Sequence, residues 1–107
     1  MSALATVFTD LAAEVDIPAE GTLSRVLYKD DRIRVVIFAF DTDQELTEHT
    51  ASVDAVIQVV KGRLRLTLGD ETVETDPGSW VHMPPHLRHS VLALEPSVML
   101  LSMLRGA

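Results

Sequence analysis

The hydrophobic residues of this chain fall into eight short runs, and turn-forming residues such as Gly69-Asp70 and Pro84-Pro85 separate them. Glycine tolerates a positive φ and proline fixes φ, so each such pair favours a turn. The pattern predicts an all-β sandwich or barrel over residues 22–107, preceded by an arm at residues 1–21. The predicted strands are residues 22–29, 32–41, 52–61, 63–68, 71–75, 80–84, 88–94 and 97–104.

Within the arm, the residues from Thr9 to Val15 predict a short helix. We expect the Thr9 side chain to cap its first turn, because a threonine hydroxyl accepts a hydrogen bond from a free backbone N–H there.

Alternation along the runs distinguishes strands with one wet face from strands that are apolar on both. In residues 63–68 the leucines share one face and polar residues the other, which is typical of a half-buried strand. Residues 34–40, 56–60 and 98–104 are apolar on both faces, which a barrel with a solvated exterior does not need. We therefore expect a second copy, in a two-fold homodimer, to cover part of the outer surface. The alternative is that the N-terminal segment folds back over it. The residues expected on this surface are Phe38, Phe40, Met99, Leu101 and Met103.

Composition narrows the classes of function. The 107 residues contain 9 Lys and Arg against 16 Asp and Glu, for a net charge of −7, which disfavours nucleic acid as a partner. The chain has no cysteine, which excludes disulfides, cysteine-ligated zinc and thiol catalysis. The sequence shows no export signal and no run of about 18 apolar residues, so we expect a cytoplasmic protein with no membrane partner.

Two stretches, DQELTEHTASVDAVIQVVKG and GSWVHMPPHLRHSVLA, carry spaced histidine, glycine and proline residues. The first begins at Asp43, has His49 and closes on Gly62, and the second has Gly78, Pro84 and His89. These spacings resemble the two motifs of the small single-domain cupins, the conserved-barrel type with an RmlC-like jelly roll. The resemblance implies a double-stranded β-helix, or jelly-roll, barrel.

The same resemblance implies an incomplete metal site. His49 and His89 stand at positions of metal-binding histidines in the family, whereas Ala51 and Ala55 stand where a second histidine and a glutamate would be. The cofactor that it implies is a divalent first-row metal, Zn, Ni, Fe, Cu or Mn. In the second motif the other departures are His86 in place of a glycine and Ala93 in place of an asparagine.

Alternate residues on a strand share a face, so we expect His49 and His89 to lie in a pocket with small apolar walls. Because a catalytic zinc site normally has three protein ligands, His82 is our expected third donor and His86 an exposed turn residue. The alternative is a pair of neutral histidines that bind no metal. The residues expected to line the pocket are Ala51, Val53, Ala55, Ile57, Val91 and Ala93.

Three hypotheses of function remain. The first is a metal-dependent enzyme, dioxygenase-like or isomerase-like, that acts on a small oxygen-rich organic molecule. The second is a non-catalytic module that binds or senses a small molecule in a roomy pocket. The third is a structural dimer with a vestigial pocket. No nucleophilic triad, phosphate loop or dinucleotide motif is readable in the sequence.

Overall fold

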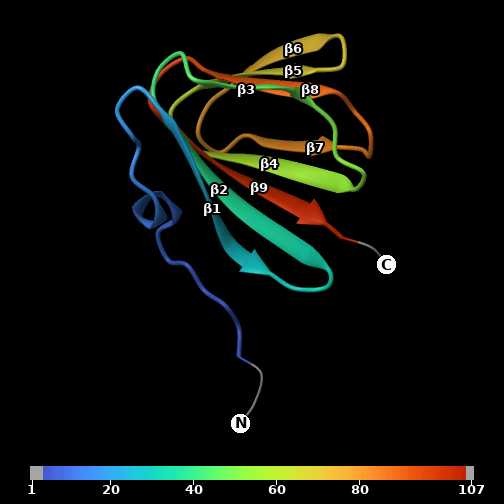
Figure 1. Cartoon of the computed structure of the whole chain (residues 1–107). Coiled ribbons are helices and arrows are strands. Elements are labelled where there is room, and N and C mark those ends of the chain that lie inside the picture. The colour runs from blue at the N-terminus through green and yellow to red at the C-terminus, as the bar shows by residue number, and fades with distance from the viewer. Residues whose placement is uncertain (1–3, 106–107) are drawn as a thin grey trace.

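The computed structural model describes residues 4–105, which form two antiparallel β-sheets packed face to face, with an N-terminal arm alongside the larger sheet (Figure 1). The arm contains one 3-10 turn, η1 (Leu11–Glu14). The strands are β1 (Thr22–Lys29), β2 (Ile33–Phe40), β3 (Glu45–His49), β4 (Asp54–Lys61), β5 (Leu64–Leu68), β6 (Glu71–Thr75), β7 (Trp80–Met83), β8 (His89–Ala93) and β9 (Ser97–Leu104).

The larger sheet has the strand order β1-β2-β9-β4-β7, and the smaller one has the order β3-β8-β5-β6. Every pairing is antiparallel, and successive strands cross repeatedly between the two sheets. This is a jelly roll, and the predicted fold is confirmed. In the part of the chain that the structure covers, no helix is long and apolar enough to cross a membrane.

The interior lies between the two sheets. Phe40 and Ile57 of the larger sheet pack there against Leu64 and Leu66 of the smaller one, all at most 1% exposed. Burial of this much apolar surface is the main force that holds the two sheets together. The leucines of β5 share the buried face, as their alternation predicts.

The residues expected on the outer surface instead face the interior, so this prediction is wrong. Phe38 and Met99 are cross-strand neighbours, and both belong to the core between the sheets. Alternation reveals that two faces exist, and it does not reveal which one turns inward. The same core also contains the remaining members of the expected surface, Phe40, Leu101 and Met103.

The outer face of β2 and β9 carries the second apolar set, with Ile37 and Leu100 among its members, and the arm covers it. Leu11, Val15 and Ile17 of the arm pack on this face, as the course of the arm beside the larger sheet in Figure 1 suggests. The alternative in which the N-terminal segment folds back is therefore the observed one. The homodimer stays a prediction. The argument from an uncovered apolar surface no longer supports it, because the arm covers the outer face of β2 and β9.

Two local predictions also need correction. The turn in the arm begins after Asp10, whose side chain makes no capping bond, so Thr9 is not the cap. The residues from His49 onward do not form one continuous strand, because β3 ends at His49 and β4 begins at Asp54. Strand β3 has no counterpart among the predicted strands. Leu46 is its one apolar residue, and the strand lies at the edge of its sheet, so the hydrophobic pattern gives no signal for it.

Candidate functional site

His49 and His89 lie side by side at one end of the barrel. They are cross-strand partners in the ladder between β3 and β8. Their ring centroids are 4.1 Å apart, with an angle of 63° between the ring planes. The fold therefore brings together two imidazoles that are 40 positions apart in the sequence.

Each ring is anchored in the same way. His49 Nδ1 lies 2.7 Å from the carbonyl oxygen of Thr47, and His89 Nδ1 lies 2.9 Å from that of Leu87. A carbonyl oxygen only accepts, so each Nδ1 carries the proton that it donates. In the neutral rings, Nε2 then keeps a lone pair, and within residues 4–105 neither Nε2 has a hydrogen-bond partner. Both rings are thus oriented to offer Nε2 as an acceptor or as a metal ligand.

The two histidines differ in exposure. His89 is only 5% exposed, whereas His49 is open to solvent. Burial lowers the pKa of His89, the bond to Leu87 partly opposes this, and the neighbouring His49 lowers it further. The buried ring is therefore held toward its neutral form, in which its Nε2 can accept.

The structure does not bring His82 to this pair. Its neighbour Met83 points into the core, so His82 faces the outside of β7, where its Nε2 lies 2.7 Å from an Asp54 carboxylate oxygen. His86 is an exposed turn residue with a φ of 69°, as expected from its loop. Its backbone N–H donates to the Ala51 carbonyl, which ties the β7–β8 loop to the β3–β4 loop.

The expected lining residues divide into two groups. Ala55 and Ile57 of β4 and Val91 and Ala93 of β8 are at most 2% exposed and lie in the packed core. Ala51 and Val53 instead belong to the β3–β4 loop, because the strand is interrupted there. The expected lining residues therefore do not form a single row on one strand. Some of them lie in the packed core and the others lie in the β3–β4 loop.

Ala55, where the resemblance implies a missing glutamate, has two methionines beside it. Met83 of β7 and Met103 of β9 are its cross-strand partners, and both pack in the core. Directly opposed residues in a ladder project from the same face, so these flexible side chains flank the alanine. The side chains beside Ala55 are therefore apolar core residues, and neither replaces the missing glutamate as an oxygen donor.

A cupin domain model matches residues 36–103, which is more than half of the chain. The chain belongs to the cupin family. Its match to a conserved protein of unknown function from Streptococcus pyogenes has 29% identity and a TM-score of 0.86, and covers 99% of this chain and 92% of that one. No curated protein matches the sequence.

Other solved cupin-like structures share the fold at lower identity. A cupin superfamily protein from Desulfitobacterium hafniense is 22% identical with a TM-score of 0.86, over 91% of this chain and 89% of that one. KdgF from Halomonas sp. is 23% identical with a TM-score of 0.77, over 87% of each chain. At these identities the likeness shows the fold alone.

This cupin does not offer a complete metal centre of its own. His49 and His89 supply two nitrogen donors, and among the described residues no group of three or more His, Asp or Glu side chains is placed to hold an ion. Catalytic zinc sites normally have three protein ligands and structural ones have four. The donors that residues 4–105 bring together therefore do not fit a metal bound by protein ligands alone.

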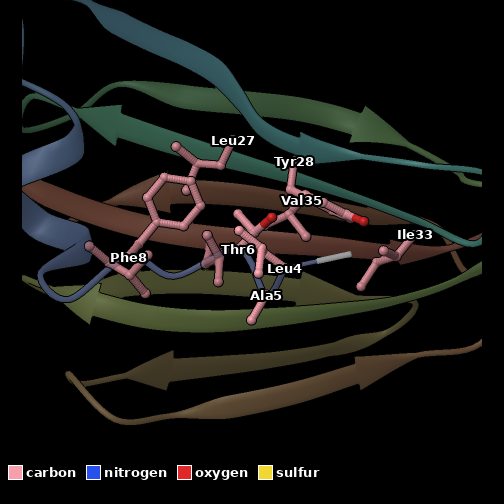
Figure 2. A pocket seen from close by; sticks show the side chains of 10 residues that line it. Leu4, Ala5, Thr6, Phe8, Leu27, Tyr28, Ile33 and Val35 are labelled. Carbon is pink, nitrogen blue, oxygen red and sulfur yellow. The ribbon is translucent and has the colours of Figure 1, made fainter. Parts of the chain in front are cut away.

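Away from the histidines, a hollow of about 420 Å³ lies between the arm and the outer face of the larger sheet. Figure 2 shows Leu4 and Phe8 of the arm facing Leu27 and Val35 across it. It lies on the outside of β1 and β2, separated from the imidazoles by the larger sheet.

Proposed function

We propose that this cupin binds a small organic molecule at the mouth of its barrel, where His49 and His89 orient it through hydrogen bonds to Nε2. The observation that carries the proposal is the paired anchoring of both Nδ1 atoms on backbone carbonyls. Such anchoring fixes the direction of each ring before any ligand arrives, which lowers the entropy cost of binding. The ligand expected from two Nε2 acceptors is one that carries hydroxyl or other donor groups.

The apolar core next to His89 supports the same proposal. Val91 and Ala93 share a face of β8 with His89 and lie in the packed apolar core, so the side of the site toward the interior is apolar. Small-molecule sites usually combine apolar walls with a few polar groups that set the orientation. The second hypothesis of function expects a roomy pocket, whereas the expected lining residues on β4 and β8 are packed in the core, so the proposed ligand would bind at the mouth and not within the barrel.

A second candidate is a metal-assisted version of the same site, favoured by the free Nε2 atoms of both rings. In this version a first-row ion would take two ligands from His49 and His89 and the others from the organic molecule and water. If the protein is an enzyme, we expect the metal-assisted site, and not the metal-free one, to carry out the reaction.

The test is a thermal-shift screen of small polyhydroxylated and carbonyl compounds on the wild type, His49→Ala and His89→Ala. His82→Ala is the matched control, because it removes an imidazole from the outer face of the barrel. We expect compounds that raise the Tm of the wild type and of His82→Ala but not of the other two variants. Equal shifts in all four proteins, or no shift with any compound, would overturn the proposal.

Elemental analysis of protein purified without chelator or affinity-tag metal decides between the two versions. One metal ion per chain in the wild type, lost in both His49→Ala and His89→Ala, would establish the metal-assisted version. A metal-free wild type that still gives the histidine-dependent Tm shift would establish the first.

A further inference from the structure

We infer that Lys29, Arg34 and Arg105 form a binding subsite for an oxyanion group, carboxylate or phosphate, at the barrel mouth. A hollow of about 250 Å³ lies between these three cations. The rest of its lining is Ser52, Val53 and Met103, so no acidic residue among those described lines it. Three positive charges and a hydroxyl around one hollow are complementary to a small anion.

The sheet register places two of these cations against each other. Lys29 and Arg34 are directly opposed in the ladder between β1 and β2, so their side chains leave the same face of the sheet. Like charges in this position repel each other and destabilise the strand pair. An anion bound between the two cations would offset this repulsion. Anion binding would therefore account for two like charges at directly opposed positions.

No carboxylate of the described residues neutralises the three cations. The ion pairs found in residues 4–105 involve Arg25, Arg63, Arg65 and His82. Two nearby acids have other partners: Asp30 accepts bonds from the Tyr28 hydroxyl and two backbone N–H groups, and Asp54 contacts His82. Asp31, in the same turn as Asp30, is not among the residues that line the hollow. On a chain of net charge −7, a hollow whose charged lining residues are all cations is a local exception.

Arg105 is held in place by the neighbouring turn. Its backbone N–H donates to the Arg32 carbonyl at 2.7 Å, and its Nη1 donates to the Asp30 carbonyl at 3.2 Å. A guanidinium has five N–H donors in a planar fork, so this one bond leaves donors available for an oxyanion. The turn therefore positions the arginine without neutralising its charge.

The hollow opens at the same end of the barrel as the histidine pair. Arg34 is opposite Met103, which packs on the core and also flanks Ala55. Ser52 and Val53 belong to the short loop that directly follows His49. In Figure 1 this loop, the β1–β2 turn and the end of β9 all lie at one end of the molecule.

This placement deepens the proposed function and in that respect rests on it: the molecule bound at the mouth would be an organic acid or a phosphate ester. Its anionic group would lie on Lys29, Arg34 and Arg105, and its hydroxyl or carbonyl groups would reach toward His49 and His89. An arginine pairs in a bidentate fashion with either carboxylate or phosphate, so the two sources are distinguished by experiment.

The experiment is isothermal titration at low ionic strength with malonate, inorganic phosphate and the neutral isostere malonamide. The variants are Lys29→Gln and Arg34→Gln, with Arg32→Gln as the control, since it removes the same charge from the adjacent turn outside the hollow. We expect an oxyanion to bind the wild type and Arg32→Gln within threefold of each other. Affinity should fall at least tenfold in Lys29→Gln and in Arg34→Gln, and malonamide should not bind.

Stronger binding of malonate than phosphate would assign an organic acid, and the reverse order would assign a phosphate ester. Undiminished affinity in Arg34→Gln with an unchanged Tm, or no binding of either anion to the wild type, would overturn the subsite. The proposed function fails separately: anion affinity that depends on Arg34, with no compound that depends on His49 or His89, would leave the subsite standing alone. Ligands that depend on the histidines and ignore Arg34 would leave the function standing without the subsite.

Discussion

The two ends of this barrel differ in whether their polar side chains have partners within the protein. At the end where β4 leads into β5, Arg63 pairs with Asp76 at 2.8 Å and with Glu74 at 3.2 Å. The buried Ser97 hydroxyl at the same end lies 2.7 Å from the Glu95 carbonyl oxygen. At the other end, both imidazole Nε2 atoms and the cations around the hollow have no acidic partner within the described part of the chain.

The difference separates folding from binding. Paired polar groups lower the free energy of the folded state, whereas unpaired ones have interactions still to make with another molecule. The first end can therefore be called the closed end and the second the open end. Substitutions of the paired groups should cost stability, whereas substitutions of the unpaired groups at the open end should change ligand affinity and leave stability nearly unaltered or improved.

The largest effect is expected from Gly62→Ala at the closed end. Gly62 has a φ of 79°, and a Cβ there would lie 2.3 Å from the Pro96 carbonyl oxygen and from Ser97 Oγ. The backbone would have to move, so we expect a loss of roughly 4 kcal/mol or more in the free energy of unfolding. Urea denaturation measures it. Gly78→Ala is the control, with a φ of 94° and no atom within 4 Å, and should lose only about 1–2 kcal/mol. Equal losses would show that the close approach of Gly62 to Ser97 is unimportant.

The next effect is expected from Ser97→Ala. Ser97 is fully buried, and its hydroxyl lies between the carbonyl oxygens of Glu95 and Arg63, at 2.7 and 3.2 Å. Removing the hydroxyl takes a hydrogen-bond donor away from these part-buried carbonyl oxygens, at a cost of about 1–2 kcal/mol. Ser52→Ala at the open end removes an exposed hydroxyl and should change the free energy of unfolding by less than about 0.5 kcal/mol. A greater loss in Ser52→Ala than in Ser97→Ala would contradict the division into two ends.

The closed end is also the part that sequence reasoning described best. Glycine and proline spacing defined its turns, and the alternation of Leu64 and Leu66 gave the buried face of β5, because a strand with one wet face shows its period directly. Strand β3 has a single apolar residue, so the same method had no signal there. For β2, which is apolar on both faces, periodicity could not show that the arm, rather than a second chain, lies on the outer face.

At the open end, the family resemblance supplied His49 and His89, and the structure places them in contact. The orientation of His82 depends on which face of β7 turns inward, and the anchoring of the two rings depends on backbone carbonyls. The opposition of Lys29 and Arg34 follows from the register of a hairpin with a bulge, which no local pattern gives. These features are properties of the assembled sheets, so they were not accessible from the sequence.

A smaller effect, and one that depends on pH, is expected from Asp30→Asn in the turn at the open end. The Asp30 carboxylate accepts bonds from the Tyr28 hydroxyl, chiefly, and from two backbone N–H groups, which lower its pKa below the ordinary 3.8. A lowered folded-state pKa means that this stabilisation is present above the ordinary pKa and is lost as the pH falls through the lowered value. The wild type should thus exceed Asp30→Asn in stability at pH 5–7 by less than the loss in Ser97→Ala, and the gap should narrow below about pH 4.

Urea midpoints measured from pH 7 to pH 3 test this expectation. Asp31→Asn is the charge-matched control, because it removes a carboxylate from the same turn without those three bonds. A gap of constant size down to pH 3 would mean that the carboxylate does not hold the turn. The open end would then lack even the one polar network that positions Arg105.

The smallest effect has the opposite sign and distinguishes the two ends most clearly. Lys29→Gln should raise the free energy of unfolding by a few tenths of a kcal/mol at low ionic strength, because it removes a like charge opposite Arg34. On a chain of net charge −7, losing a cation should otherwise increase the overall repulsion, so a gain in stability can come only from a local clash of charges. Lys61→Gln, at the closed end, makes the same change in net charge and should give no gain. The gain should disappear in 1 M salt, where screening reaches about 3 Å. Saturating malonate should reverse it, since the anion would stabilise the wild type more than the variant. If Lys29→Gln and Lys61→Gln behave alike in all three conditions, the cations of the open end are ordinary surface charges and only the histidines distinguish the mouth.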